Sequence, residues 1–313
     1  MATILVTGGA GFIGSHIAEA LVRRGDQVRI LDNLCTGFRR NLSAFEKDVQ
    51  FIEGDISDPE IVAKALSGVE YVFHEAALAS VPLSVERPLD SNRACVTGTL
   101  NILDQAHRAG VHRVIYAGSS AAYGDRPNAS KRETDMQMIL SPYAAAKLAG
   151  ELYCQAFYHT HGLETVCLRY FNVFGPRQDP NSAYSAVIPL FITKLLAGVS
   201  PVVYGDGLQS RDFTFVENVV HGNLLAAKAA EAPGKTFNIA DGRSTTLLHL
   251  LGLLEELLDV DVNPVHEAPR LGDVRESLAD VTAARTTLGY EPKVTFEEGL
   301  RRSITYYRSV IAA

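Results

Sequence analysis

The stretch that decides the fold is residues 3–14, which read Thr3-Ile4-Leu5-Val6-Thr7-Gly8-Gly9-Ala10-Gly11-Phe12-Ile13-Gly14. Its first five residues are β-branched or apolar and predict a buried strand. Glycines at positions 8, 11 and 14 then predict a tight turn into a helix. Such a turn lets the backbone approach a pyrophosphate, whose charge is stabilised by the positive N-terminal end of the helix. The alternative is an ordinary strand-to-helix turn.

Asp32 favours the nucleotide interpretation of this turn. It ends the second predicted strand, 18 residues beyond Gly14. A carboxylate at that place can accept both ribose hydroxyls and repel a 2′-phosphate. The sequence therefore predicts a site for NAD rather than NADP, with Asp32 as a simple turn residue before Asn33 as the alternative.

Strands and helices alternate from this point to about residue 170. Asp58 and Pro59 predict a helix start, and Gly25 and Gly68 predict helix ends. Parallel strands need crossover helices, so the alternation predicts a doubly wound α/β fold with helices on both faces of a parallel sheet. Strands are expected at 4–7, 28–31, 69–73, 113–117 and 165–170, and helices up to residue 24, after residue 58, at 92–108 and at 142–159.

After about residue 172 the alternation gives way to loops that contain glycine and proline. No internal repeat or low-complexity segment is visible. We expect a second, smaller lobe that caps the first. Helices after residue 172 are predicted at 187–197, 217–230, 247–258 and 296–310.

Composition limits the class of protein. The 313 residues include 29 basic and 36 acidic side chains, for a net charge of −7, and no basic run that could follow a phosphate backbone, so a nucleic acid partner is not expected. No apolar stretch is long enough to cross a membrane and no leader pattern is present, which predicts a cytoplasmic protein. The four cysteines have no C-x-x-C spacing, so we expect reduced thiols and no metal site.

Tyr143 and Lys147 lie four residues apart in the helix that Ser141 and Pro142 are expected to open. This spacing puts both side chains on one helical face. The ammonium can then lower the pKa of the phenol, as a general base near neutral pH requires. Without the dinucleotide motif, such a pair is more often ordinary surface decoration.

Ser119 and Ser120 directly follow the strand predicted at 114–118. They therefore lie at a carboxyl end, where ligands of open α/β sheets bind. A hydroxyl there can share the proton of Tyr143. The alternative is a pair of serines that satisfy backbone groups of the loop.

Together these residues resemble an extended short-chain dehydrogenase/reductase that acts on nucleotide-sugars, and the resemblance covers the whole chain. The later motifs are most similar to UDP-hexose 4-epimerases; they are Arg169-Tyr170-Phe171-Asn172-Val173-Phe174-Gly175-Pro176-Arg177, Gly205-Asp206-Gly207, Ser210-Arg211-Asp212-Phe213 and Arg270-Leu271-Gly272-Asp273. The resemblance implies a Rossmann-like, doubly wound parallel sheet with a smaller C-terminal α/β substrate lobe. Residues 1–172 would form the NAD-binding domain and receive segment 211–240, whereas 173–210 and 241–313 would form the nucleotide-sugar lobe.

The resemblance also implies a set of cofactor contacts. The pyrophosphate and adenosine of NAD would be held by Gly8, Gly11, Phe12, Ile13, Gly14, Asp32 and Asn33. Asp55 and Ile56 would flank the adenine, and Ala76, Ala77 and Leu78 would line the path of the cofactor. Its nicotinamide end would meet Tyr143, Lys147 and Phe171.

For a UDP-sugar the implied contacts come mainly from the later motifs. Arg211 and Arg270 would clamp the diphosphate, as guanidinium groups suit phosphate oxygens, and Asp273 would contact the uridine ribose. Two ordinary surface arginines are the alternative. Uracil and sugar would be contacted by Asn172, Val187 and Tyr204, with Ser119, Ser120, Tyr143 and Ser277 around the sugar. Two departures from the family pattern are Cys95, where most relatives have asparagine, and Ala79, where glucose-type epimerases have lysine.

The implied reaction interconverts UDP-glucose and UDP-galactose through a transient 4-keto sugar, with Ser119, Tyr143 and Lys147 as catalytic residues and NAD regenerated in each turnover. Ser277 is small where epimerases restricted to unacetylated sugars carry tyrosine. UDP-N-acetylglucosamine and UDP-N-acetylgalactosamine are therefore expected substrates too. The alternative is that Ser277 only begins a strand at residues 278–280. A homodimer is expected through the helix around 96–107 and the helix that carries Tyr143, with Leu100, Leu103, Leu152 and Phe157 as candidate buried positions unless they face the sheet.

Other functions stay open. A 4,6-dehydratase needs an acid and a base, which in dehydratases are carboxylates in the two positions after the catalytic hydroxyl residue; here those positions are Ser120 and Ala121. A nucleotide-sugar decarboxylase or reductase is a further alternative. A non-catalytic NAD-sensing protein is compatible with the fold but would not need Ser119, Tyr143 and Lys147 together.

Overall fold

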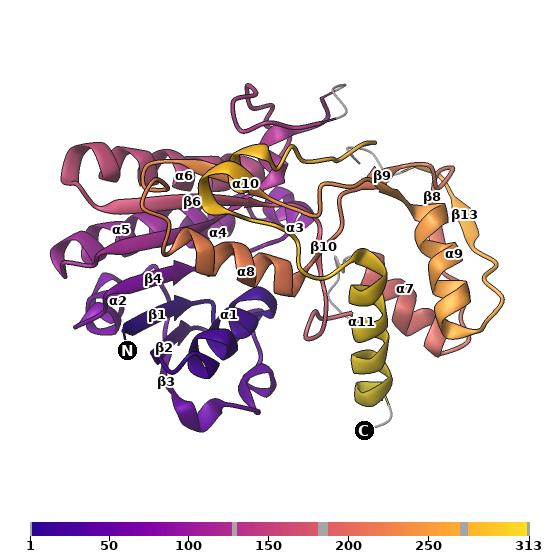
Figure 1. Ribbon diagram of the computed structural model, residues 1–313, viewed down its shortest axis with the longest axis horizontal. Coiled ribbons are helices and arrows are strands. Elements are labelled where there is room, and N and C mark those ends of the chain that lie inside the picture. The colour runs from indigo at the N-terminus through magenta and orange to yellow at the C-terminus, as the bar shows by residue number, and fades with distance from the viewer. Residues whose placement is uncertain (1, 127–129, 181–186, 270–274, 312–313) are drawn as a thin grey trace.

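The computed structural model describes residues 2–126, 130–180, 187–269 and 275–311. A seven-stranded sheet lies at its centre, in the order β11-β6-β5-β4-β1-β2-β3, and every neighbouring pair in it is parallel (Figure 1). The doubly wound α/β fold predicted from the sequence is confirmed. The strands are β1 (Thr3–Thr7), β2 (Gln27–Asp32), β3 (Val49–Glu53), β4 (Tyr71–His74), β5 (Arg113–Ser119), β6 (Glu164–Tyr170) and β11 (Thr236–Ile239).

Helices cover both faces of this sheet. One face packs against α1 (Phe12–Arg23), α8 (Val216–Ala226) and α10 (Thr282–Leu288), with buried residues such as Ile17 and Val219 between them. The other face packs against α2 (Pro59–Leu66), α5 (Gly98–Arg108) and α6 (Pro142–His161), with Val62 and Ile102 buried. Since both faces are covered, the central strands are almost entirely buried, as expected for a parallel sheet.

Local signals set the ends of the main helices. The Asp58 carboxylate accepts hydrogen bonds from the backbone N–H of Glu60 and Ile61, which satisfies otherwise unpaired donors at the start of α2. Ser141 caps α6 in the same way, through the N–H of Ala144. Gly162 ends α6 in the left-handed conformation, with φ of 68°.

A second lobe surrounds its own apolar core, beside the carboxyl side of the sheet (Figure 1). Phe174, Phe213 and Phe296 meet there with ring centroids 5.4 to 6.5 Å apart. Its helices are α7 (Val187–Leu196), α9 (Leu247–Leu258) and α11 (Phe296–Ile311), and its short strands pair as β7 (Val173–Phe174) with β10 (Thr214–Phe215), β8 (Val202–Tyr204) with β13 (Val265–Glu267), and β9 (Ser210–Arg211) with β12 (Thr245–Thr246).

Three details differ from the sequence-based prediction. Strands β3 and β11 were not among those expected, although both extend the main sheet. The helix expected at 92–108 is broken into α4 (Pro88–Asn92), a π-helical turn (Arg93–Thr97) and α5, and α3 (Val81–Glu86) precedes it. Residues 278–280, read as a strand, form only isolated bridges, with Ala279 pairing to Lys131.

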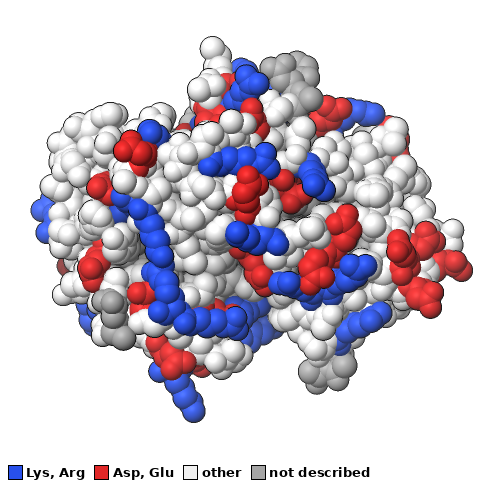
Figure 2. All heavy atoms as spheres, in the orientation of Figure 1, with Lys and Arg blue, Asp and Glu red and all other residues white. Residues whose placement is uncertain are grey.

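The surface is mixed in charge. Figure 2 shows basic and acidic side chains interspersed over one face of the molecule. Several of them pair, for example Arg302 with Glu217 and Glu298, each at 2.8 Å. Within the described residues, no helix is long and apolar enough to cross a membrane.

Candidate active site

The glycine-rich turn between β1 and α1 is packed too tightly for a side chain at Gly8 or Gly14. Gly8 has φ of 67°, and a Cβ added to it would lie 2.7 Å from the backbone nitrogen of Ala76, beyond the end of β4. A Cβ on Gly14 would lie 2.2 Å from the carbonyl oxygen of Gly8, and one on Gly11 would lie 3.1 Å from it. The turn therefore forms a backbone-lined cradle at the start of α1, which fits a pyrophosphate.

Asp32, at the end of β2, lies against the same turn. Its carboxylate accepts hydrogen bonds from the N–H of Ala10 at 2.9 Å and of Leu34 at 2.8 Å. Burial raises the pKa of Asp32, against the lowering effect of these two hydrogen bonds. The Asp32 side chain, which is predicted to bind the ribose, is thus already held in place by backbone groups of the adjacent loops. The glycine-rich cradle together with this carboxylate fits NAD.

Asn33 and Asp55 form the far end of the proposed cofactor site. Asn33 Nδ2 donates to Asp55 Oδ2 at 3.1 Å, and the N–H of Ser57 donates to Asp55 Oδ1 at 2.7 Å. Burial acts to raise the pKa of Asp55, but these hydrogen bonds and the charge of Arg93 together lower it. Ile56, the next residue along the chain, is buried; the adenine contacts expected of Asp55 and Ile56 stay predictions.

Buried polar side chains on β1, β4 and α5 form a hydrogen-bonded chain next to the glycine-rich turn, and they were not predicted from the sequence. Thr7 Oγ1 lies 2.7 Å from His74 Nδ1, and His74 Nε2 lies 2.9 Å from Thr99 Oγ1. Burial and the charge of Lys147 lower the pKa of His74 to about 3, so this imidazole is neutral. Thr7 Oγ1 also accepts the N–H of Ala76 at 3.2 Å, which ties β1 to the loop that carries Ala76, Ala77 and Leu78.

Glu75 is a partly buried group that periodicity did not reveal. Tyr170 Oη donates to its Oε1 at 2.9 Å, and Asn223 Nδ2 donates to Tyr170 Oη at 2.8 Å. Burial raises the pKa of Glu75 to about 7, although Tyr170 and the charge of Lys147 lower it. A glutamate next to a buried strand end was the only available signal in the sequence.

Tyr143 and Lys147 lie on the inner side of α6, as their spacing predicted. Lys147 is 4% exposed, and its Nζ donates to the carbonyl of Ala117 on β5 at 2.8 Å. The N–H of Tyr143 donates to Ser84 Oγ on α3 at 3.0 Å. The first turn of α6 is thus held between β5 and α3.

The pKa of Tyr143 is raised overall, which differs from the sequence-based prediction. Burial raises it most; the charge of Lys147 lowers it, a nearby Cys95 thiol raises it, and a hydrogen bond with Ser119 lowers it. Lys147 therefore acts in the predicted direction but does not outweigh desolvation in this structure. Ser119 also caps the short 3-10 helix Ser120–Tyr123, accepting the N–H of Ala121 at 3.2 Å.

The two departures from the family pattern lie in different surroundings. Cys95 is 1% exposed and belongs to the π-helical turn before α5, where its carbonyl accepts Thr99 Oγ1 at 2.7 Å. Cys95 is one of the groups that raise the pKa of Tyr143. Ala79, by contrast, is exposed in the loop before α3.

The residues predicted to bind the sugar nucleotide lie on several elements, with Arg211 in β9. Arg211 Nη1 donates to the carbonyl of Ser210 at 2.9 Å, and the N–H of Ser277 donates to that carbonyl at 3.1 Å. Asp212 fixes this region by accepting backbone N–H groups of Asp241, Gly242 and Ala279 at 2.9 to 3.2 Å. Burial raises the pKa of Asp212 to about 7 despite these bonds.

The remaining predicted contacts are more scattered. Phe171 is buried, 6.0 Å from the Tyr123 ring, and Asn172 follows it, with its carbonyl bound to the N–H of Thr214. Val187 begins α7 and Tyr204 ends β8. Arg270 and Asp273 lie outside the described residues. Among those described, no group of three or more histidine, cysteine or acidic side chains could hold a metal ion.

Comparison with known proteins identifies the class. The profile of the NAD dependent epimerase/dehydratase family matches residues 4–240. The chain belongs to this family, and its cofactor is NAD.

Two solved structures are similar over almost their full length. UDP-glucose 4-epimerase from Thermotoga maritima, solved with UDP-glucose, is 40% identical with a TM-score of 0.94, and 99% of each chain is covered. UDP-N-acetylglucosamine 4-epimerase from Methanobrevibacter ruminantium, in complex with UDP-N-acetylmuramic acid, is 41% identical with the same TM-score and coverage. A dTDP-glucose 4,6-dehydratase from an Actinoplanes species is also 34% identical over 98% of each chain. Overall similarity thus shows a nucleotide-sugar epimerase/dehydratase but does not choose between these reactions.

Proposed function

We propose that the protein is an NAD-dependent UDP-hexose 4-epimerase that interconverts UDP-glucose and UDP-galactose. The observation that carries the proposal is the short helix Ser120–Tyr123, which directly follows Ser119 at the carboxyl end of β5. Its first two residues are serine and alanine, so the acid and base that elimination of water would require are missing there. Tyr143, Lys147 and Ser119 remain, and they suffice for the proton transfers of reversible hydroxyl oxidation in which NAD would accept and return the hydride.

In the proposed reaction Tyr143 accepts the proton of the C4 hydroxyl as C4 is oxidised, and it returns the proton when C4 is reduced on the opposite face. NAD, when bound, supplies hydride acceptance and donation. Lys147 favours the phenolate of Tyr143 through its charge, and Ser119 orients the shared proton through its hydroxyl. Arg211 and Arg270 would hold the diphosphate while the keto sugar turns.

The proposal extends to UDP-N-acetylglucosamine and UDP-N-acetylgalactosamine. It rests on Ser277, whose backbone is fixed to Ser210 next to Arg211. A serine leaves room for a 2-acetamido group where a tyrosine ring would fill it. The similarity to a UDP-N-acetylglucosamine 4-epimerase supports this extension.

We further propose that residues 1–172 with segment 211–240 bind NAD, that 173–210 and 241–313 bind the sugar nucleotide, and that the protein is a cytoplasmic homodimer. Leu152 on α6 is 55% exposed and Leu89 on α4 is 82% exposed, which fits a surface covered by a second copy. Leu103 and Phe157 instead pack in the core behind the sheet. Sedimentation at micromolar concentration tests the dimer, and a 34 kDa species would contradict it.

Nuclear magnetic resonance of UDP-glucose and UDP-N-acetylglucosamine incubated with the purified protein tests the activity. The expected products are the two C4 epimers. A 4-keto-6-deoxy product would show a dehydratase instead. No turnover of either sugar by protein that contains NAD would favour an NAD-sensing protein.

A further inference from the structure

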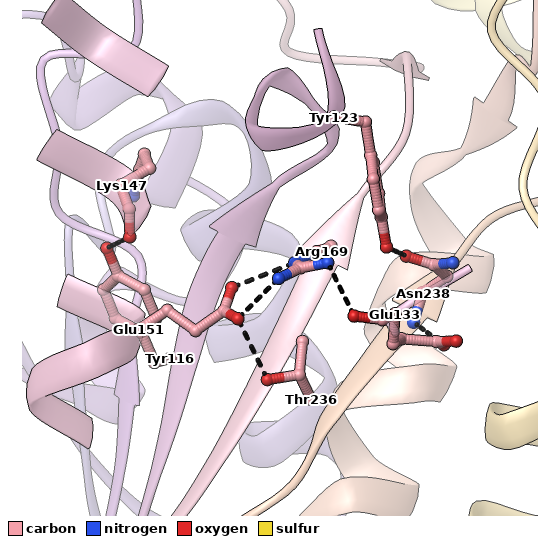
Figure 3. Close-up of polar contacts among 8 residues, drawn as sticks. All are labelled: Tyr116, Tyr123, Glu133, Lys147, Glu151, Arg169, Thr236 and Asn238. Carbon is pink, nitrogen blue, oxygen red and sulfur yellow. Dashed lines mark hydrogen bonds and ion pairs between the residues drawn. The ribbon is translucent and has the colours of Figure 1, made fainter. Parts of the chain in front are cut away.

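A buried ion pair anchors α6 one turn beyond Lys147. Glu151 Oε1 lies 2.6 Å from Arg169 Nη2, and Glu151 Oε2 lies 3.0 Å from Arg169 Nε. The Arg169 and Glu151 side chains are 1% and 4% exposed. Figure 3 shows the carboxylate of α6 facing the guanidinium of β6. Two parallel hydrogen bonds tolerate little sliding or rotation, so the pair fixes the seat of α6 on the sheet.

The same face of α6 carries the groups proposed to react. Tyr143, Lys147 and Glu151 are spaced by four residues and therefore share one side of the helix. Tyr116 on β5 packs against the same stretch of α6. Its Oη donates a hydrogen bond to the carbonyl of Lys147 at 3.1 Å, and a Cβ added to Gly150 would lie 2.2 Å from Tyr116 Oη. A small shift of α6 would therefore move Lys147 relative to β5 and to Tyr143.

Arg169 also contacts residues outside α6. Its Nη1 donates to the carbonyl of Glu133 at 3.4 Å, and its Cζ lies 4.8 Å from the centre of the Tyr123 ring. Tyr123 Oη donates to Asn238 Oδ1 at 2.6 Å, and Asn238 Nδ2 donates to the carbonyls of Lys131 and Asp280 at 3.0 Å each. Figure 3 shows this network from Glu151 as far as Asn238. The bond from Asn238 to the carbonyl of Asp280 continues it to the segment 275–280, which carries Ser277.

Stability alone does not account for this pair. Burying two charges costs about as much as their attraction returns, and apolar residues of similar volume often serve as well. What apolar residues cannot supply is directional contact. We propose that Glu151 and Arg169 are positioning residues, which hold Tyr143 and Lys147 in place against the segment that carries Ser277. This inference rests on the proposed epimerase function.

The test replaces the pair without leaving a charge unpaired. Glu151→Gln combined with Arg169→Met keeps the approximate volumes and the net charge. The control is Glu164→Gln with Arg113→Met, which removes an ion pair between β6 and β5 at the opposite end of β6 from Arg169; there Arg113 Nε lies 2.7 Å from Glu164 Oε2. Circular dichroism and NAD binding check that both double variants are folded.

For the Glu151/Arg169 variant we expect kcat to fall at least about tenfold, with KM for UDP-glucose within about threefold of wild type. The control should keep kcat within about twofold of wild type. Equal losses in the two variants, or an unchanged kcat in the first, would overturn the proposal, because the pair would then act only on stability.

A second readout does not depend on epimerase activity. Phenolate absorbance of each protein, minus that of the same protein carrying Tyr143→Phe, reports the pKa of Tyr143. The Glu151/Arg169 double variant has the same net charge as wild type. A rise of about half a unit or more in the pKa of Tyr143 would therefore report displacement of Lys147 from Tyr143. An unchanged titration would overturn the proposal even if wild type epimerises no sugar. Should this variant not fold, Glu151→Asp keeps both charges and shortens the carboxylate, and the same titration then decides.

Discussion

Glu75→Gln is predicted to stabilise the protein at mildly alkaline pH and to change its stability little in acid. Burial raises the pKa of Glu75 to about 7 from 4.5, so the folded protein holds this proton more tightly than the unfolded chain does. The resulting stabilisation is complete below pH 4.5 and is lost as the pH rises to 7. The difference, 7 minus 4.5, corresponds to a loss of about 3 kcal/mol. Glutamine has no proton to lose and can still accept the hydrogen bond from Tyr170.

Urea unfolding of wild type and variant at pH 5 and pH 8 measures this effect. At pH 8 the variant should unfold with a free energy about 3 kcal/mol above that of wild type, and at pH 5 the two should agree within about 1 kcal/mol. The control is Glu53→Gln, at the exposed end of β3. Two results would refute the reasoning: equal unfolding free energies of wild type and Glu75→Gln at pH 8, or the same difference between them at pH 5 and at pH 8. In either case ionisation of the Glu75 carboxyl would carry no penalty.

Three further predictions concern the proposed site. Tyr143→Phe should lower turnover at least about 100-fold while UDP-sugar binding, measured by calorimetry, survives; a variant that keeps a tenth of the activity would contradict Tyr143 as the base. NAD should bind more tightly than NADP, since the Asp32 carboxylate opposes a 2′-phosphate and Arg39 is paired with Glu46; equal affinities in the same titration would exclude this. Ser277→Tyr should suppress epimerisation of UDP-N-acetylglucosamine selectively, and equal slowing of both sugars would argue against a steric gate.

Much of the fold could be predicted because its signals are local. Gly8 and Gly14 stand where no side chain fits, and Asp58 and Ser141 cap helices within three residues of themselves. Such features depend on the backbone nearby and not on the rest of the molecule. The β-branched strands followed by helices then leave few topologies to consider.

Strand β11 shows where this reasoning failed. Its sequence Thr236-Phe237-Asn238-Ile239 contains an asparagine, a residue that is depleted in strands. Asn238 is nevertheless fully buried, because Tyr123, Lys131 and Asp280 supply partners for its side chain. Two of these partners precede it by more than 100 residues, so no window of sequence could show that its polarity is satisfied.

The buried groups of the site follow the same physical rule. A polar side chain inside a protein must find a hydrogen-bond partner, so His74 at the end of an apolar strand implies partners without identifying them. Thr7 lies 67 residues before it and Thr99 lies 25 residues after it. Because Thr7 also binds the loop beyond β4, the neutral His74 helps to hold the glycine-rich turn against Ala76. The glycines and Asp32 could be predicted as NAD contacts from their spacing, whereas the residues that hold them in place are defined only by the folded chain.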